Sequence, residues 1–216
     1  AMSTYPSFNP NERNISTFNN YFLEGTIECW SVFKPFIYAD SIEEGKYDHN
    51  AYYNSGSYNV YYGNKLVATI KDHNGGQGWG TITYDQGLYH SSNVAICNLL
   101  DQGYVTKDVL TEKLNDLGFF QGDTMDGLTC SSSINAYTRK NAGRLEYLTT
   151  GFGQGSTVTP YQLLKAYSVF GNDGKTVQPH IVDKVVNPET NKVVYQATPK
   201  YSKQIFSTNT ISQVKD

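Results

Sequence analysis

The chain has 216 residues, enough for one large domain or two small ones, and its 17 basic and 20 acidic residues give a net charge of −3. The charges form no long run of either sign, which argues against the clustered basic face of a nucleic-acid-binding protein. No stretch approaches the roughly 18 uninterrupted apolar residues of a membrane span. The sequence shows no signal peptide, so any targeting segment or anchor is expected to lie outside it.

The cysteines exclude two further classes of protein. Cys29, Cys97 and Cys130 are too few and too scattered for a disulfide framework or a zinc site. At most one disulfide bond can form among them, which leaves one thiol over. We therefore expect no metal and no cofactor.

The first half of the chain predicts one clear helix between irregular segments. Residues 3–20 are rich in Ser, Thr, Asn and Pro and predict an irregular surface segment. Residues 31–44 predict a helix that ends at Gly45, with Pro35 near the first turn, where a helix tolerates proline. Residues 46–80 predict small strands and loops. The apolar residues at helical spacing in the predicted helix are Val32, Phe33, Phe36, Ile37 and Ile42.

The middle of the chain predicts three more helices. Residues 81–104 indicate two helices, separated by a break at 90–93. Residues 106–119 indicate an amphipathic helix with Thr106 as its N-cap and Gly118 just past its end.

Residues 121–150 are polar, and we expect loops there. Residues 158–175 predict a capped helix, residues 180–197 a strand–turn–strand unit, and residues 207–216 a helix-like segment. Both ends of the chain look cut from something longer, so we expect a part of a larger domain.

The first pattern with chemical meaning is the pair Ser31 and Lys34, at the start of the predicted helix. Residues three apart share one helical face, so the lysine amine can reach the serine hydroxyl. Serine is a poor nucleophile until a base takes its proton, and a lysine desolvated by neighbours such as Trp30 and Phe33 has a lowered pKa and can act as that base. An ordinary helix start with an exposed lysine is the alternative interpretation.

A second pattern, Ser91-Ser92-Asn93, lies in the predicted break between two helices. A hydroxyl there can transfer protons, and the Asn93 amide can hold the backbone of an acyl substrate. The same residues can instead cap the helix that follows them.

A third stretch, "GFGQGSTVTPYQLLKAYSVFGNDGKTVQPHIV" at residues 151–182, resembles the block before the last strands of penicillin-binding protein transpeptidase domains. Residues 3–11, "STYPSFNPN", resemble the segment leading into the same domain. The family's motifs are Ser-x-x-Lys, then Ser-x-Asn, then Lys-Thr-Gly, and the first two occur here in that order.

The resemblance implies a role for each matching residue. Ser31 becomes the acylated nucleophile, Lys34 its base, Ser91 a second proton-transferring hydroxyl and Asn93 a substrate-amide binder, while Trp30 stands beside the nucleophile as a substrate contact. The implied partners are peptidoglycan stem peptides ending in D-Ala-D-Ala, β-lactam antibiotics and other cell-wall synthesis proteins. The implied location is the extracytoplasmic face of the bacterial membrane.

Two features depart from the family pattern. Cys29-Trp30 replaces the Pro-Gly that the family usually has before the nucleophile, and no Lys-Thr-Gly is present. The nearest match, Gly174-Lys175-Thr176-Val177, predicts only a surface turn. Cys29 itself has two interpretations, a reactive thiol or a small buried apolar residue.

The resemblance implies an α+β fold: the mainly helical portion of a DD-peptidase/β-lactamase-like transpeptidase fold, with most of the central antiparallel sheet missing. The first strand of that sheet would end near Ala1-Met2. Without the sheet, we expect apolar surface to be exposed. The expected divisions of this partial domain are a lead-in segment at 1–30, the nucleophile helix at 31–45, small strands and loops at 46–80, and at 81–216 a helical region with a C-terminal hairpin and helix.

The function that the resemblance implies is a peptidoglycan DD-transpeptidase acting through an acyl-serine. Two alternatives stay open. One is a non-catalytic relative that binds cell-wall peptide or a partner, which Trp30 and the missing Lys-Thr-Gly favour. The other is a serine β-lactamase.

Overall fold

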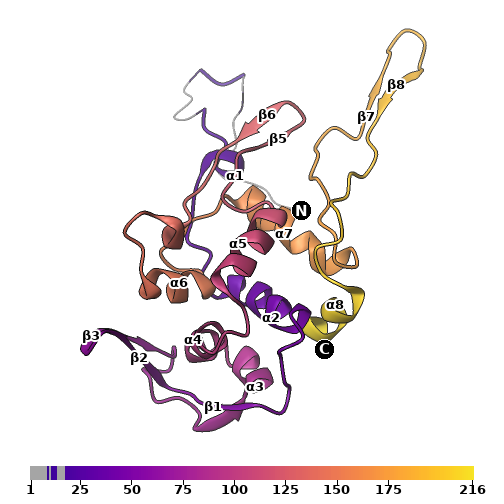
Figure 1. Cartoon of the computed structure of the whole chain (residues 1–216). Helices are drawn as coiled ribbons and strands as arrows, with labels where there is room; N and C mark the ends of the chain where they lie inside the picture. Colours follow the sequence, from indigo (N-terminus) through magenta and orange to yellow (C-terminus); the bar gives the residue numbers. More distant parts are fainter. Residues whose placement is uncertain (1–8, 10, 14–17) are drawn as a thin grey trace.

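The computed structural model describes residues 9, 11–13 and 18–216 (Figure 1). The predicted end of a central strand near Ala1-Met2 lies outside these residues, as does most of the predicted surface segment at 3–20. None of the helices in the described ranges has the length and apolar character needed to cross a lipid bilayer.

The helix predicted at residues 31–44 is confirmed, with a change of geometry in its first turn. A 3₁₀ turn, η1 (Trp30–Phe33), runs directly into the α-helix α2 (Lys34–Glu43), and Gly45 follows at φ 67°. Pro35 lies in the first turn of α2, where the missing N–H would have had no helical partner. Helix α2 is almost completely buried, and Figure 1 shows it in the middle of the helices.

The other predicted helices are also confirmed. Thr106 caps α5, with Val109 N donating to Thr106 Oγ1, and Gly118 follows it at φ 89°. Thr159 caps α7, and Gln162 N donates to Thr159 Oγ1 at 3.1 Å. These helices are α3 (Tyr84–Tyr89), α4 (Asn93–Asp101), α5 (Lys107–Asp116), α7 (Pro160–Gly171) and α8 (Thr208–Lys215).

Four separate two-stranded antiparallel sheets accompany the helices, and the described residues form no larger sheet. The fold is therefore the α+β, mainly helical one that was predicted. The pairs are β1 (Tyr52–Asn54) with β4 (Thr81–Thr83), β2 (Ser57–Tyr62) with β3 (Lys65–Lys71), β5 (Asp123–Met125) with β6 (Leu128–Cys130), and β7 (Lys184–Val186) with β8 (Val193–Gln196).

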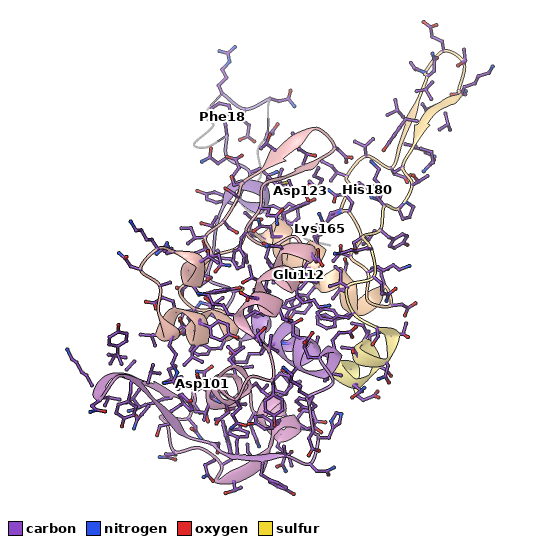
Figure 2. All side chains as sticks on the ribbon, viewed as in Figure 1. Phe18, Asp101, Glu112, Asp123, Lys165 and His180 are labelled. Atoms are coloured by element: carbon purple, nitrogen blue, oxygen red, sulfur yellow. The ribbon has the colours of Figure 1, made fainter. Side chains whose placement is uncertain are left out.

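The prediction of loops at 121–150 is wrong. This stretch forms the β5–β6 hairpin, a 3₁₀ turn η2 (Ala136–Thr138) and most of helix α6 (Arg144–Gly151). Few residues of α6 are buried, so its apolar periodicity is weak. Tertiary contacts hold both elements instead: Gly151 packs closely against α4, and Asp123 on β5 pairs with Lys165 on α7 at 2.7 Å. Both residues of this ion pair are labelled in Figure 2.

Two smaller differences concern short elements. The prediction of a helix from residue 81 is wrong at its start, because 81–83 form strand β4 and the helix begins after the Thr83 capping box. A four-residue helix, α1 (Tyr21–Glu24), was not predicted; the side chain of Asn20 caps it.

One main apolar core joins α2 to helices α4, α5 and α7. Its centre is aromatic, with Phe36 in edge contact with both Phe119 and Tyr167 at centroid distances of 5.3 and 5.1 Å. The β7–β8 hairpin extends away from this body and exposes apolar side chains, Val194 among them at 64 % (Figure 1). These apolar side chains belong to the hairpin, so the exposure expected for the helices around Ser31 stays a prediction.

Candidate active site

Lys34 connects the two predicted motifs directly. Its Nζ donates to Ser31 Oγ at 3.1 Å, to Ser91 Oγ at 3.1 Å and to the Ser91 carbonyl oxygen. The lysine is 1 % exposed, whereas Ser31 is open to solvent. An exposed hydroxyl therefore stands next to a buried amine that also holds a second hydroxyl.

Burial changes the acid–base behaviour of this amine. Loss of hydration lowers the pKa of Lys34 to about 8 from its ordinary 10.5, although the charge of Asp72 opposes the shift. At pH 7 about one lysine in ten is then neutral and able to accept a proton. Phe33 lies in the core beside this residue in the chain, whereas Trp30 is 58 % exposed, so the indole is not the desolvating neighbour that was expected.

The Ser91-Ser92-Asn93 triplet lies in the break between α3 and α4, as predicted, and Ser91 and Ser92 make different contacts. Ser91 adopts φ 53° and contacts Lys34. Ser92 is buried and caps α4 by accepting from Ala95 N at 3.0 Å. The two interpretations of the triplet, a site and a helix cap, thus apply to neighbouring residues.

Ser31, which is exposed, and Ser91 and Asn93, which are partly buried, line one cavity of about 480 Å³. Lys34 does not line it but reaches it through its hydrogen bonds to Ser31 and Ser91. The structure therefore brings together all five residues that the sequence singled out, and it adds three that were missed. The lining residues are Trp30, Ser31, His73, Ser91, Asn93, Phe152 and Gln154.

The backbone around Ser31 is bound to the segment 153–158. Ile27 and Val158 form an antiparallel bridge with N–O distances of 2.9 and 2.8 Å. Gly155 N donates to Glu28 Oε1 at 2.8 Å. The stretch of sequence that most resembles the family thus holds the segment before Ser31, the predicted nucleophile, in place, a role that sequence spacing alone could not reveal.

A further contact comes from α7. The Tyr167 hydroxyl donates to the carbonyl oxygen of Val32, the residue after Ser31. The Tyr167 ring also packs against Phe36 of α2. Helix α7 therefore also holds the 3₁₀ turn that carries Ser31.

Trp30 has a backbone conformation that bulky residues rarely adopt. Its φ of 53° lies in the left-handed region, which costs a residue with a Cβ about 1–2 kcal/mol. Its N–H donates to Gly153 O at 3.0 Å, which holds it there. Strained residues of this kind cluster at functional sites.

Asp72, a buried carboxylate that contacts the Ser91-Ser92-Asn93 region, was missed by the sequence analysis. It is 2 % exposed; Oδ1 accepts from Ser92 Oγ at 2.8 Å and from Val94 N at 3.1 Å, and Oδ2 accepts from Gly56 N at 2.8 Å. It therefore fixes the start of α4, where the Ser-x-Asn motif lies. The only indication in the sequence was an acidic residue directly after the alternating segment "KLVATIK".

The interpretation of Cys29 as a small buried residue is supported. Its side chain is buried, and burial raises the pKa of the thiol to about 12, so the reactive thiolate is scarce at neutral pH. All three cysteines are buried and free of disulfide bonds.

The segment Gly174-Lys175-Thr176-Val177 forms the predicted turn after α7, with Gly174 at φ 86°. Thr176 is buried, however, so the segment is not wholly a surface turn. Lys175 and Thr176 line cavities other than the one at Ser31. This near match therefore does not take the place of a Lys-Thr-Gly motif beside the nucleophile.

Comparisons with known proteins agree with this geometry. The domain described as "Penicillin binding protein transpeptidase domain" matches residues 1–216. Stage V sporulation protein D of Bacillus subtilis is 30 % identical over 221 residues, covering 100 % of this chain and 33 % of that protein. A peptidoglycan D,D-transpeptidase FtsI homolog of Mesostigma viride is 25 % identical over 209 residues, covering 89 % of this chain and 33 % of its own length.

A solved structure shows the same fold. Penicillin-binding protein A from M. tuberculosis, in an imipenem acyl-enzyme complex, has a TM-score of 0.78 at 15 % identity, covering 91 % of this chain and 44 % of that one. This chain spans about a third of the length of the two curated relatives. The chain belongs to the penicillin-binding protein transpeptidase domain family.

Proposed function

We propose that this domain carries the nucleophile part of a peptidoglycan DD-transpeptidase site, which the D-Ala-D-Ala end of a stem peptide acylates and which β-lactams block. The observation that carries the proposal is the buried Lys34 amine, 3.1 Å from both Ser31 Oγ and Ser91 Oγ. The D,D-transpeptidase name of the Mesostigma relative and the imipenem acyl-enzyme of the structural neighbour support the same reaction and the same inhibitor class.

In the proposed reaction, neutral Lys34 accepts the Ser31 proton while Ser31 Oγ attacks the carbonyl carbon of the penultimate D-Ala. The peptide C–N bond breaks, and the proton passes from Lys34 through the Ser91 hydroxyl to the leaving nitrogen. An amine of a second stem peptide then attacks the acyl-serine and returns its proton by the same route. Asn93 and Trp30 are the proposed contacts for the substrate.

The oxyanion of the intermediate needs two N–H donors, and Ser31 N–H is the proposed first one. In the family, the second comes from the strand with Lys-Thr-Gly, a motif that the 216 residues do not contain. Loss of one such donor typically lowers the rate by about 10²–10³. Slow acylation is therefore the expectation for these 216 residues by themselves.

A second candidate function is a non-catalytic module that binds cell-wall peptide. The exposed indole of Trp30, in a strained conformation beside Ser31, favours it. Either function acts on peptidoglycan, so the proposed location is the extracytoplasmic face of the membrane. Other cell-wall synthesis proteins are the proposed further partners.

The deciding experiment measures intact mass after incubation with benzylpenicillin. The comparison uses a Ser31→Ala variant and, as a matched control, Ser57→Ala, which removes an exposed hydroxyl that does not line the cavity. A long-lived adduct that is absent only from Ser31→Ala supports the transpeptidase. A short-lived adduct with release of hydrolysed penicillin indicates a β-lactamase, and no adduct combined with peptide binding indicates the binding module.

A further inference from the structure

Gln154 lines the Ser31 cavity, and no role has been assigned to it so far. The residue is half-buried, and its side-chain amide has no hydrogen-bond partner among the residues that the structure describes. An amide has two N–H donors and an oxygen acceptor, and all of them are available here. Partly buried amides usually find partners in the folded protein, so this one is suited to a ligand.

The backbone of Gln154 has a fixed position relative to Ser31. Its N–H donates to Thr149 O at 3.0 Å. The residue before it, Gly153, accepts from Trp30 N at 3.0 Å, and the residue after it, Gly155, donates to Glu28 Oε1 at 2.8 Å. Since both neighbours bind the segment that leads into Ser31, the Cα of Gln154 is held at a fixed place relative to Ser31. Such preorganisation reduces the entropy lost on binding.

Asn93 brings few hydrogen-bonding groups to a peptide in this cavity. One of its two Nδ2 hydrogens already goes to Lys71 O at 2.9 Å, which leaves one N–H and Oδ1 for a substrate. A peptide backbone also presents carbonyl oxygens, which need a donor. Gln154 Nε2 supplies an unused donor on the wall of the same cavity.

We infer that Gln154 is a substrate-binding residue that donates from Nε2 to a backbone carbonyl on the acyl side of the peptide, while Asn93 Oδ1 accepts a backbone N–H. The inference rests on the proposed function, which makes an acyl-D-Ala-D-Ala peptide the ligand of this cavity. The two amides come from separate segments of the chain, so together they fix both the position and the direction of the peptide.

The test measures the Kd of Nα,Nε-diacetyl-L-Lys-D-Ala-D-Ala by isothermal titration, in a Ser31→Ala background so that no acyl-enzyme forms. Gln154→Ala is expected to weaken binding about 5- to 10-fold, the range of one hydrogen bond. Gln154→Glu keeps the shape of the side chain and removes the donors, so an equal or larger loss is expected. Gln77→Ala, an exposed glutamine that does not line the cavity, is the matched control and should bind as tightly as the background.

Several results would overturn the inference: an unchanged Kd for Gln154→Ala, full binding by Gln154→Glu, or no peptide binding by the background protein. Failure of the proposed function looks different. If the peptide binds in a Gln154-dependent way but benzylpenicillin leaves Ser31 unmodified, the transpeptidase proposal fails and the role of Gln154 stands. If the penicillin adduct forms but the Kd of the peptide is unchanged in Gln154→Ala, the inference alone fails.

Discussion

Trp30 and Gly153 are in direct backbone contact. Trp30 N donates to Gly153 O at 3.0 Å, and a Cβ added to Gly153 would lie 2.1 Å from Trp30 O. Gly153 also adopts φ 78°, which side chains rarely allow. Glycine at 153 is therefore required both by its own conformation and by the residue that precedes the nucleophile.

Replacing Gly153 should cost more stability than replacing a glycine in an ordinary left-handed turn, and it should also displace the backbone next to Ser31. Gly153→Ala is expected to lower the free energy of unfolding by more than the roughly 1–2 kcal/mol of the left-handed conformation, because the Trp30 backbone must also move. Acylation by benzylpenicillin should fall with it. Gly103→Ala is the control, with φ 74° and no atom within 4 Å of the added Cβ. The free energy of unfolding of both variants is measured by urea denaturation, and an equal decrease in the two would contradict the prediction.

The backbone strain at residue 30 should show as a difference in stability between a glycine and an alanine variant at this position. Trp30→Gly is expected to be more stable than Trp30→Ala by roughly 1 kcal/mol, since only alanine keeps a Cβ in the left-handed region. Both variants lose the indole, so both should lose the same affinity for benzylpenicillin. Thermal unfolding and acylation kinetics measure the two effects separately, and an Ala variant as stable as the Gly variant would rule out the strain.

Lys34 should set the pH dependence of acylation. Its pKa is lowered to about 8, so the neutral base is scarce at pH 6 and becomes the main form above pH 8. The second-order acylation rate constant should therefore rise about tenfold per pH unit below pH 8 and level off above it. Stopped-flow measurement with a chromogenic cephalosporin gives the profile. A rate that is flat between pH 6 and 8 would show that Lys34 is not the base.

Asp72 should stabilise the motif that contains Ser91. Asp72→Asn converts one carboxylate oxygen into a donor that faces other donors, so at least one of its hydrogen bonds to Ser92, Val94 and Gly56 is lost. The expected cost is about 1–3 kcal/mol of unfolding free energy. Asp48→Asn, an exposed loop residue whose Oδ1 accepts from Asn50 N, is the control and should cost less than 1 kcal/mol. Chemical denaturation of both variants makes the comparison.

The sequence by itself determined the elements whose information is local. Helix α7 was predicted because Thr159 caps it and Pro160 opens it, and α5 because Thr106 and Gly118 mark its ends. Spacing also predicted that Ser31 and Lys34 share a face, since residues three apart on a helix are neighbours. Helix α6 was not predicted, because little of its surface is buried and its apolar residues therefore show only a weak helical spacing.

Only the tertiary structure decided what surrounds Ser31. The contact between Lys34 and Ser91 joins residues 57 apart in the chain, and Gly155 meets Glu28 across 127 residues. Asp72 and Gln154 carry no local pattern, because an acidic residue after a strand and a glutamine in a glycine-rich loop are each common on protein surfaces. The role of Asp72 and the proposed role of Gln154 depend on burial and on proximity in space, which local sequence patterns do not encode.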